Sequence, residues 1–246
     1  MIDSHCHLDD SRVQQDLAGV LQRARMAGVT HHVIAGVHHR RWSLQQAIQQ
    51  RYTGVSNAFG VHPWFCHEHR EQDWQQLFDY ISDAVAIGEC GLDGMKHRPP
   101  MALQKRWFQK HIDLAAETGL PLVIHAVKAV HEVLAMLQPY PQIRGVVHGF
   151  SGSLEQANEV VRAGFLLGIG TRTINISSEK VCEMLRMIPL SSIMLESDAP
   201  DGLPNGARNE PANLRQVITA LSKLRNQDES LIVSACTAQT KELFHL

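Results

Sequence analysis

The first residues of the chain, MIDSHCHLDD, contain two histidines separated by a single cysteine. In an extended strand, alternate side chains share a face, so His5 and His7 point the same way and Cys6 points to the opposite side. Two imidazoles on one face can bind a metal ion, but a catalytic metal site needs further ligands. The pair therefore directs attention to the histidines and carboxylates elsewhere in the chain.

Further candidate ligands stand at the ends of short apolar runs. Eight such runs begin near residues 2, 32, 57, 84, 120, 145, 165 and 192. A lone histidine or carboxylate after such a run is usually a turn former or a helix cap. Several of them together, in segments as apolar as PLVIH and GVVH, predict a shared site. The candidates are His5, His7, His62, Glu89, Asp93, His125, His148, Glu196 and Asp198.

Amphipathic helix patterns lie between most of the apolar runs. Apolar residues recur at helical spacing in the ranges 17–24, 74–81 and 103–114. The four residues from Ser153 to Gln156 have the sequence of a capping box, which marks the start of another helix. A last helix is expected after residue 228.

Eight strand candidates that alternate with helices predict an α/β fold, a (β/α)8 TIM barrel. The length of 246 residues is close to the roughly 250 typical of this fold. A doubly wound open sheet is the alternative, but the glycine-rich phosphate-binding patterns typical of such sheets do not follow any of the runs. Residues 1–246 are expected to form one domain, because no segment has the composition of a linker.

The barrel fold would bring the candidate ligands together, because active sites in these barrels lie at the carboxyl ends of the strands. Imidazole and carboxylate ligands without cysteine suit zinc, manganese, nickel, cobalt or iron in a catalytic site. Four histidines and two carboxylates are more than one tetrahedral ion requires, so two ions are expected. Glu89 is suited to bridge them, since its two oxygens carry the charge that lets two cations approach each other.

The remaining histidines are expected to be solvated. His31, His32, His38 and His39 lie at predicted strand starts or in polar loops, as does the HEH group at 67–69. The cysteines that adjoin ligand candidates, Cys6 and Cys90, should face away from the site and pack in the core.

Composition excludes several classes of protein. The formal net charge of −2 argues against a general attraction to nucleic acid, although a locally basic cleft remains compatible with it. The five cysteines are odd in number and include no C-x-x-C pair, which favours a reducing compartment. A signal peptide and a membrane-spanning run are not recognisable, so a cytoplasmic protein is expected.

Seven short motifs, in order and spacing, resemble those of the TatD family of metal-dependent hydrolases, which have amidohydrolase-like barrels. The resemblance covers almost the whole chain. The motifs are HCH at 5–7, GVHP at 60–63, GECGLD at 88–93, PLVIH at 121–125, HGFSG at 148–152, ESDAP at 196–200 and RNEP at 208–211.

The resemblance implies a metal-dependent deoxyribonuclease, similar to 3′-exonucleases, that cleaves phosphodiesters with a water activated by two divalent ions (Zn, Mn, Mg, Ni or Co). DNA or another phosphoester would be the substrate, and Asp198 would take the proton of the water. His62 would contact a phosphate, and Arg208 would approach the substrate. By similarity, one ion would be held by His5, His7, Glu89 and Asp198, and the other by Glu89, His125 and His148.

Two residues depart from the family pattern after His125. The family usually has an arginine where this chain has Val127, and an acidic residue where it has His131. Lys128 is a poor substitute for that arginine, because it points to the other face and carries a point charge instead of a bidentate fork.

Two other functions therefore stay open. The first is a hydrolase that uses the same two-metal site on an amide, a lactone or an ester outside nucleic acids. The second is a metal-binding protein without catalysis. Neither an obligate protein partner nor a membrane is implied, and the chain is expected to act as a monomer.

Overall fold

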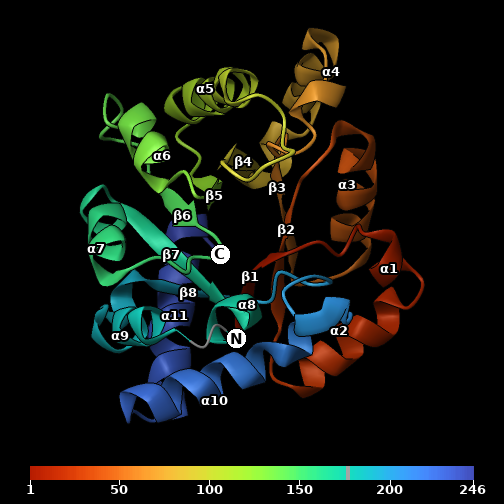
Figure 1. The fold of residues 1–246 in the computed structure, drawn as a ribbon. Helices are drawn as coiled ribbons and strands as arrows, with labels where there is room; N and C mark the ends of the chain where they lie inside the picture. The colour runs from red at the N-terminus through yellow and green to blue at the C-terminus, as the bar shows by residue number, and fades with distance from the viewer. Residues whose placement is uncertain (176–177) are drawn as a thin grey trace.

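The computed structural model describes residues 1–175 and 178–246. Its eight strands are parallel, each pairs with the next along the chain, and helices lie between them, as Figure 1 shows. The TIM-barrel prediction is therefore confirmed. The strands are β1 (Ile2–Cys6), β2 (His31–Ala35), β3 (Val55–Phe59), β4 (Ala84–Asp93), β5 (Leu122–Val127), β6 (Gly145–Val147), β7 (Phe165–Gly170) and β8 (Ile193–Glu196).

The last strand returns to the first just beyond their carboxyl ends. Asp198 N–H donates to the His5 carbonyl at 2.9 Å, and His7 N–H donates to the Ala199 carbonyl at 2.7 Å. The carboxylate of Asp3 also accepts the backbone N–H of Ser197, at 2.8 Å. These bonds hold the residues that follow β8 against those that end β1, which closes the barrel near its mouth.

The helices form the outer layer around the strands (Figure 1). Ser153 caps α7 as predicted, since its Oγ accepts Gln156 N–H at 3.2 Å and Gln156 Oε1 accepts Ser153 N–H at 3.1 Å. The helices are α1 (Ser11–Gln14), α2 (Leu17–Met26), α3 (Trp42–Arg51), α4 (Glu71–Gln75), α5 (Met101–Thr118), α6 (Val130–Leu137), α7 (Leu154–Arg162), α8 (Thr171–Ile174), α9 (Glu179–Met187), α10 (Leu214–Arg225) and α11 (Glu229–Phe244).

The helix predicted over 74–81 is wrong in its extent. Helix α4 ends at Gln75, and two 3-10 turns follow, Gln76–Asp79 and Ile81–Asp83. A 3-10 turn holds about 3.0 residues instead of 3.6, so the apolar residues do not keep to one face. Leu77 is buried, whereas Phe78 is 47 % exposed.

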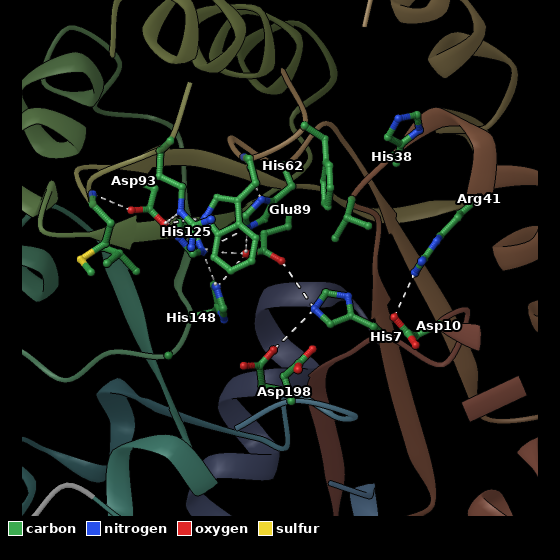
Figure 2. A pocket seen from close by; sticks show the side chains of 18 of the residues that line it. His7, Asp10, His38, Arg41, His62, Glu89, Asp93, His125, His148 and Asp198 are labelled. Atoms are coloured by element: carbon green, nitrogen blue, oxygen red, sulfur yellow. Dashed lines mark hydrogen bonds and ion pairs between the residues drawn. The ribbon is translucent and has the colours of Figure 1, made fainter. Parts of the chain in front are cut away.

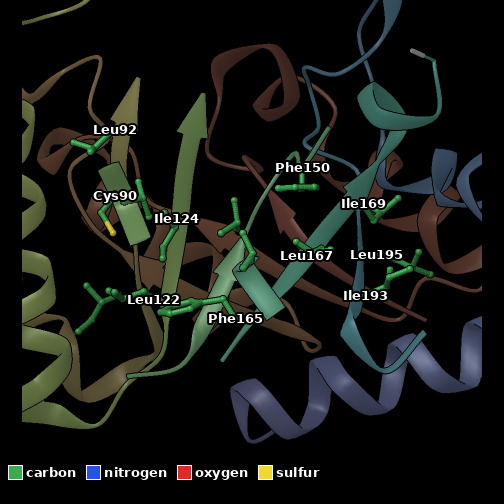
Figure 3. Close-up of a cluster of buried hydrophobic side chains, with 14 of the residues drawn as sticks. Cys90, Leu92, Leu122, Ile124, Phe150, Phe165, Leu167, Ile169, Ile193 and Leu195 are labelled. Carbon is green, nitrogen blue, oxygen red and sulfur yellow. The ribbon is translucent and has the colours of Figure 1, made fainter. Parts of the chain in front are cut away.

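Strand residues alternate between the barrel interior and the layer below the helices. Outward residues such as Cys90, Leu92, Ile124 and Leu167 pack in the main core, which Figure 3 shows. Cys6 packs among apolar residues in a second cluster, so the packing roles predicted for Cys6 and Cys90 are confirmed. The part of the chain that the structure describes contains no helix long and apolar enough to cross a membrane.

The inward residues near the strand starts form an apolar floor of the barrel. Helix α11 contacts β8 and the turn before it, and so brings Phe244 to this end. The residues of the floor are Val33, Ala58, Ala86, Val123, Val146, Met194 and Phe244, all at most 1 % exposed. Above the floor, the same strands present polar side chains.

Candidate active site

A cavity of about 670 Å³ opens at the carboxyl ends of the strands. Seven of the predicted site residues line it, as Figure 2 shows for those it labels. His5 lies beneath them and is fully buried. The seven are His7, His62, Glu89, Asp93, His125, His148 and Asp198.

Strand β1 positions the two histidines of the first motif. The His5 and His7 rings lie 5.0 Å apart, edge to face. His7 Nδ1 lies 3.0 Å from the Ala35 carbonyl oxygen, which can only accept, so this nitrogen carries the proton. His7 Nε2 is therefore the nitrogen with a free lone pair, and it faces the carboxylates of Glu89 and Asp198.

One extra residue in strand β4 turns Glu89 toward the cavity. Gly88 pairs with Val123 and Cys90 pairs with Ile124, so Glu89 has no residue of β5 opposite it. This is a β-bulge. Gly88 has φ of +143°, and a Cβ there would meet the Val123 carbonyl oxygen at 2.5 Å, so the bulge requires glycine at this position.

The two carboxylate oxygens of Glu89 face two groups of histidines. Oε2 lies 3.3 Å from His5 Nε2 and 3.7 Å from His7 Nε2. Oε1 lies 3.1 Å from His62 Nε2, 3.0 Å from His125 Nδ1 and 2.7 Å from His148 Nε2. Glu89 is thus the centre of the cluster, with one oxygen available to each side.

Asp198 lies on the His5 and His7 side of Glu89. Its Oδ1 is 3.5 Å from His7 Nε2 and 3.8 Å from His5 Nε2, and its Oδ2 is 3.7 Å from a guanidinium nitrogen of Arg172. Figure 2 shows His7 between Glu89 and Asp198. Asp198 has φ of +58°, a left-handed conformation that Asp and Asn tolerate better than most residues.

Two further carboxylates stand behind histidines of the cluster. Asp93 Oδ2 lies 3.1 Å from His125 Nε2, and Glu196 Oε1 lies 3.6 Å from His148 Nδ1. Glu196 Oε1 also accepts Gly149 N–H at 2.6 Å, which fixes its position. A carboxylate behind a histidine orients the ring and raises the basicity of its other nitrogen.

The charges in the cavity depend on one another. Burial alone would raise the pKa of Glu89, but His148, His62 and His5 outweigh it and hold this pKa well below the usual range. Burial would lower the pKa of His148, but Glu89 and Glu196 raise it well above its ordinary value. Burial lowers the pKa of His62 to about 4, so this ring is neutral.

The donor set fits divalent cations. His5 Nε2 is a buried nitrogen without a hydrogen-bond partner among the described residues, and it lies 3.3 Å from Glu89 Oε2. Unpartnered buried polar atoms are costly unless a ligand satisfies them. Around Glu89 and Asp198, three groups have ligand atoms within 4.8 Å of one another: His5, His148 and Asp198; His5, His7 and Glu89; and His62, Glu89 and His125.

The structure places the other predicted residues differently. Arg208 is not among the residues that line the cavity; its guanidinium binds Glu210 Oε1 at 2.6 Å and the Arg12 carbonyl at 3.0 Å. Val127 lines the cavity, and His131 is exposed and lies 3.4 Å from Glu159. Lys128, the substitute considered for the arginine missing at 127, is exposed and is not among the residues that line the cavity.

Sequence reasoning missed several residues of the cavity. The Arg98 guanidinium lies 3.6 Å from the centre of the Trp64 ring, and Trp64 Nε1–H donates to Asp93 Oδ2. The cavity is also lined by Arg12, Arg40, Arg41 and Arg172. The tryptophan next to the GVHP motif was a signal that could have been used, whereas the arginines lie in short helices and turns that are far apart in the sequence.

The prediction that the remaining histidines are solvated is wrong for several of them. His32 is 4 % exposed, and His38 and His69 are each 8 % exposed. His38 and His69 pack on each other and on aromatic rings, which removes them from water. His67 is exposed, as predicted.

An eight-stranded parallel barrel with histidines and carboxylates gathered at its carboxyl end defines the class of barrel hydrolases that use metal ions. The sequence profile of the family described as "TatD related DNase" matches residues 2–245. The chain belongs to this family. It is a metal-dependent hydrolase of the TatD type.

Named relatives agree with this assignment. The chain is 32 % identical over 254 residues to "Uncharacterized metal-dependent hydrolase YjjV" of Escherichia coli, covering 100 % of this chain and 98 % of the relative. It is 31 % identical to "3'-5' ssDNA/RNA exonuclease TatD" of Citrobacter koseri, covering 99 % and 98 %. The crystal structure of the E. coli TatD homologue YjjV has a TM-score of 0.95 and 30 % identity, covering 100 % and 98 %.

Proposed function

We propose that this protein is a 3′–5′ exonuclease for single-stranded nucleic acid that uses two divalent metal ions. One ion would be held by His5, His7, Glu89 and Asp198, and the other by Glu89, His125 and His148. The observation that carries this proposal is the position of Glu89, whose two oxygens each face a separate group of histidines. The name of the C. koseri relative supports the substrate.

The residues of the chain have separate tasks in this reaction. Bound divalent ions would supply Lewis-acid stabilisation of phosphate oxygens and lower the pKa of water toward about 7. Asp198 is the base: its Oδ1 accepts a proton from the attacking water. Asp93 and Glu196 hold His125 and His148 in the orientation that the cluster requires.

The cavity wall suits a single strand of nucleic acid. Trp64 is 37 % exposed, and together with Arg98 it presents a flat surface on which a terminal base can stack. His62, whose Nε2 lies 3.1 Å from Glu89 Oε1, would contact a phosphate in this proposal. Arginines at the rim could contact phosphates in exchange for their present carboxylate partners, such as Asp10 beside Arg12 and Arg41.

A hydrolase of a lactone, an amide or another ester is the second candidate function. The observation that favours it is Val127, an apolar residue in the cavity wall where the family has an arginine. An apolar wall at this place would accept an uncharged substrate more readily than a phosphate.

Two further statements belong to the proposal. The enzyme acts as a monomer and in the cytoplasm. Five free cysteines, four of them buried, suit a reducing compartment, and the bacterial TatD relatives support the same location.

The test is hydrolysis of a 5′-labelled single-stranded DNA by protein stripped of metal and resupplied with magnesium, manganese or zinc. We expect stepwise shortening from the 3′ end, absent without metal and lost in Asp198→Asn. The matched control is Asp201→Asn, because Asp201 also lines the cavity but binds Arg12 at 2.8 Å and lies outside the histidine cluster. Intact DNA under every metal, together with hydrolysis of a lactone or an aminoacyl ester, would overturn the nuclease proposal in favour of the second candidate.

A further inference from the structure

Three histidines outside the Glu89 cluster meet at the rim of the cavity. The ring centres of His38, His39 and His69 lie 4.6 Å, 4.3 Å and 4.8 Å apart, taken pairwise. His38 and His39 follow β2, and His69 follows the 3-10 turn Cys66–Glu68. Figure 2 shows His38 well apart from Glu89, and the two clusters share no residue. Two separate connections therefore bring three imidazoles into one small space.

Each of these three residues offers a nitrogen, and the three nitrogens lie within 4.8 Å of one another. Three imidazoles bound to one tetrahedral zinc ion have nitrogens about 3.3 Å apart, given a Zn–N distance of about 2.0 Å. The rings would close by up to about 1.5 Å to bind the ion, which side-chain rotation can supply. The spacing therefore suits an ion better than direct contact between the rings, because nitrogen lone pairs repel each other.

The hydrogen bonds around the cluster leave some of its nitrogens unsatisfied. His69 Nδ1 donates to the Phe65 carbonyl at 2.8 Å, and His69 Nε2 accepts the backbone N–H of His39 at 3.2 Å, so an ion bound at this Nε2 would replace that hydrogen bond. His38 Nε2 and His39 Nδ1 are buried and have no hydrogen-bond partner among the described residues. His38 is only 8 % exposed, so its unpartnered nitrogen costs free energy unless a ligand binds it.

The charges near the cluster also favour a cation. Glu68 Oε2 lies 3.5 Å from His38 Nε2, and Asp73 Oδ1 lies 3.7 Å from His39 Nε2. Burial lowers the pKa of His38, and it lowers the pKa of His69 to about 4. His38 and His69 are therefore neutral at pH 7, the form that a metal ion needs, and two carboxylates stand close to the cluster.

We propose that His38, His39 and His69 form a third metal site, distinct from the Glu89 cluster, that binds a zinc-like ion. Glu68 is the candidate fourth ligand, and Asp73 orients His39 as a carboxylate behind a ligand histidine does. Imidazole ligands select zinc, cobalt, nickel or copper, whereas magnesium and calcium prefer oxygen. The ion holds the connection after β2 to the connection after β3.

Ion binding at this place changes the rim of the cavity. His38 Nδ1 accepts Arg40 N–H at 3.2 Å, so in the metal-free state the proton of the ring is on Nε2. Coordination through Nε2 moves this proton to Nδ1 and ends the bond to Arg40 N–H. Because His38, Arg40 and Glu68 all line the cavity, the third ion adjusts the entrance through which a substrate passes.

The test is a count of zinc ions bound per chain, by mass spectrometry of the metal after gel filtration in zinc-buffered solution. The wild type is compared with His69→Gln, and the matched control is His67→Gln, an exposed histidine two residues away. We expect His69→Gln to bind one zinc ion fewer than the wild type and His67→Gln to bind the same number. The difference between variants does not depend on catalysis, so failure of the nuclease proposal would leave this result unchanged.

His38→Gln is the second variant, for the case in which His69→Gln does not fold, because His69 also donates to the Phe65 carbonyl. Replacing zinc by magnesium should abolish the difference between the wild type and either variant. Equal zinc content in the wild type, His38→Gln and a folded His69→Gln would overturn the proposal. An equal loss in His67→Gln would also overturn it, because the ion would then be bound at the surface without the cluster.

Discussion

The two ends of the barrel interior are built from the same strands but from opposite kinds of residue. At the floor, inward residues such as Val33, Ala86 and Met194 pack against Phe244 in an apolar cluster. At the mouth, inward residues of the same strands are histidines and carboxylates that crowd around Glu89. The side chains at both ends are buried, so the two ends differ in the effect of burial on the free energy of folding.

Burial stabilises the floor and costs free energy at the mouth. Each apolar side chain removed from water contributes roughly 1.5–3 kcal/mol. A buried nitrogen without a partner, such as His5 Nε2, instead costs about 1–3 kcal/mol. The floor therefore supplies stability, while the mouth holds groups that only a ligand satisfies. Substitutions at the two ends should separate these roles.

The largest effect is expected for Glu89→Gln. An amide keeps the shape but removes one of the two anionic oxygens that face the histidines. Hydrolysis should fall by about 10³-fold to 10⁴-fold, equivalent to about 4–5.5 kcal/mol, while circular dichroism still shows a folded barrel. If the turnover of Glu89→Gln were within tenfold of the wild-type value, the claim that the residues at the mouth carry the catalytic activity would be contradicted.

The floor is tested by Phe244→Ala. Removal of this fully buried ring should lower the free energy of unfolding by about 4 kcal/mol, measured by urea denaturation. Turnover per folded molecule should be unchanged at low temperature. Phe78→Ala is the control, because Phe78 is 47 % exposed and its loss should cost under about 1 kcal/mol. A loss of turnover in folded Phe244→Ala would contradict the proposed division.

A buried histidine on helix α5 predicts a pH dependence of stability. His111 Nε2 accepts Val61 N–H at 2.9 Å, and burial lowers the pKa of His111 from 6.5 to about 4. Below pH 6.5 the unfolded chain takes up a proton that the folded chain refuses. Stability therefore falls as the pH decreases from 6.5 to about 4 and levels off below that, with a total loss of about 3 kcal/mol from this residue.

The contribution of His111 is isolated by comparing the wild type with His111→Gln in urea at several pH values. The advantage of the wild type should shrink as the pH is lowered from 7 to 4. His67→Gln, at an exposed position, should give a constant difference over the same range. A constant difference for His111→Gln as well would show that the ring is not held neutral.

The smallest effect is expected for Val127→Arg. Val127 lines the cavity, so an arginine there restores a bidentate phosphate donor to the wall. KM for single-stranded DNA should fall about fivefold, near 1 kcal/mol, because the new side chain remains partly hydrated. Lys128→Arg, at an exposed position that does not line the cavity, should leave KM unchanged. A higher KM in Val127→Arg would favour an uncharged substrate.

The fold could be predicted from the sequence because the strands are short apolar runs, and most of them end in or are soon followed by a polar residue. The same rule gave His5, Glu89, His125 and Asp198 as candidates, since the carboxyl ends of parallel strands meet at one place. Helical spacing was less reliable at 74–81, where 3-10 turns replace the helix.

Contacts between separate loops could not be predicted. Trp64 and Arg98 stack on each other although they are 34 positions apart in the sequence. His38 and His69 appear in polar segments, and only the folded chain reveals that the two segments bury each other. Arg208 was assigned to the substrate from its motif, but its contacts are with Glu210 and the backbone of Arg12.

The bulge in β4 also bears on how such a barrel can change during evolution. Ala86 faces the floor and Glu89 faces the cavity, although three positions separate them and regular alternation would put them on opposite faces. The extra residue of the bulge lets both Ala86 and Glu89 face the barrel interior, while Ile87 and Cys90 both stay in the outer core. Point substitutions can replace what stands at the mouth of this strand, but only an insertion or a deletion can change which way position 89 faces. Loss of one residue here would therefore remove the central carboxylate in a single step and leave the floor in place.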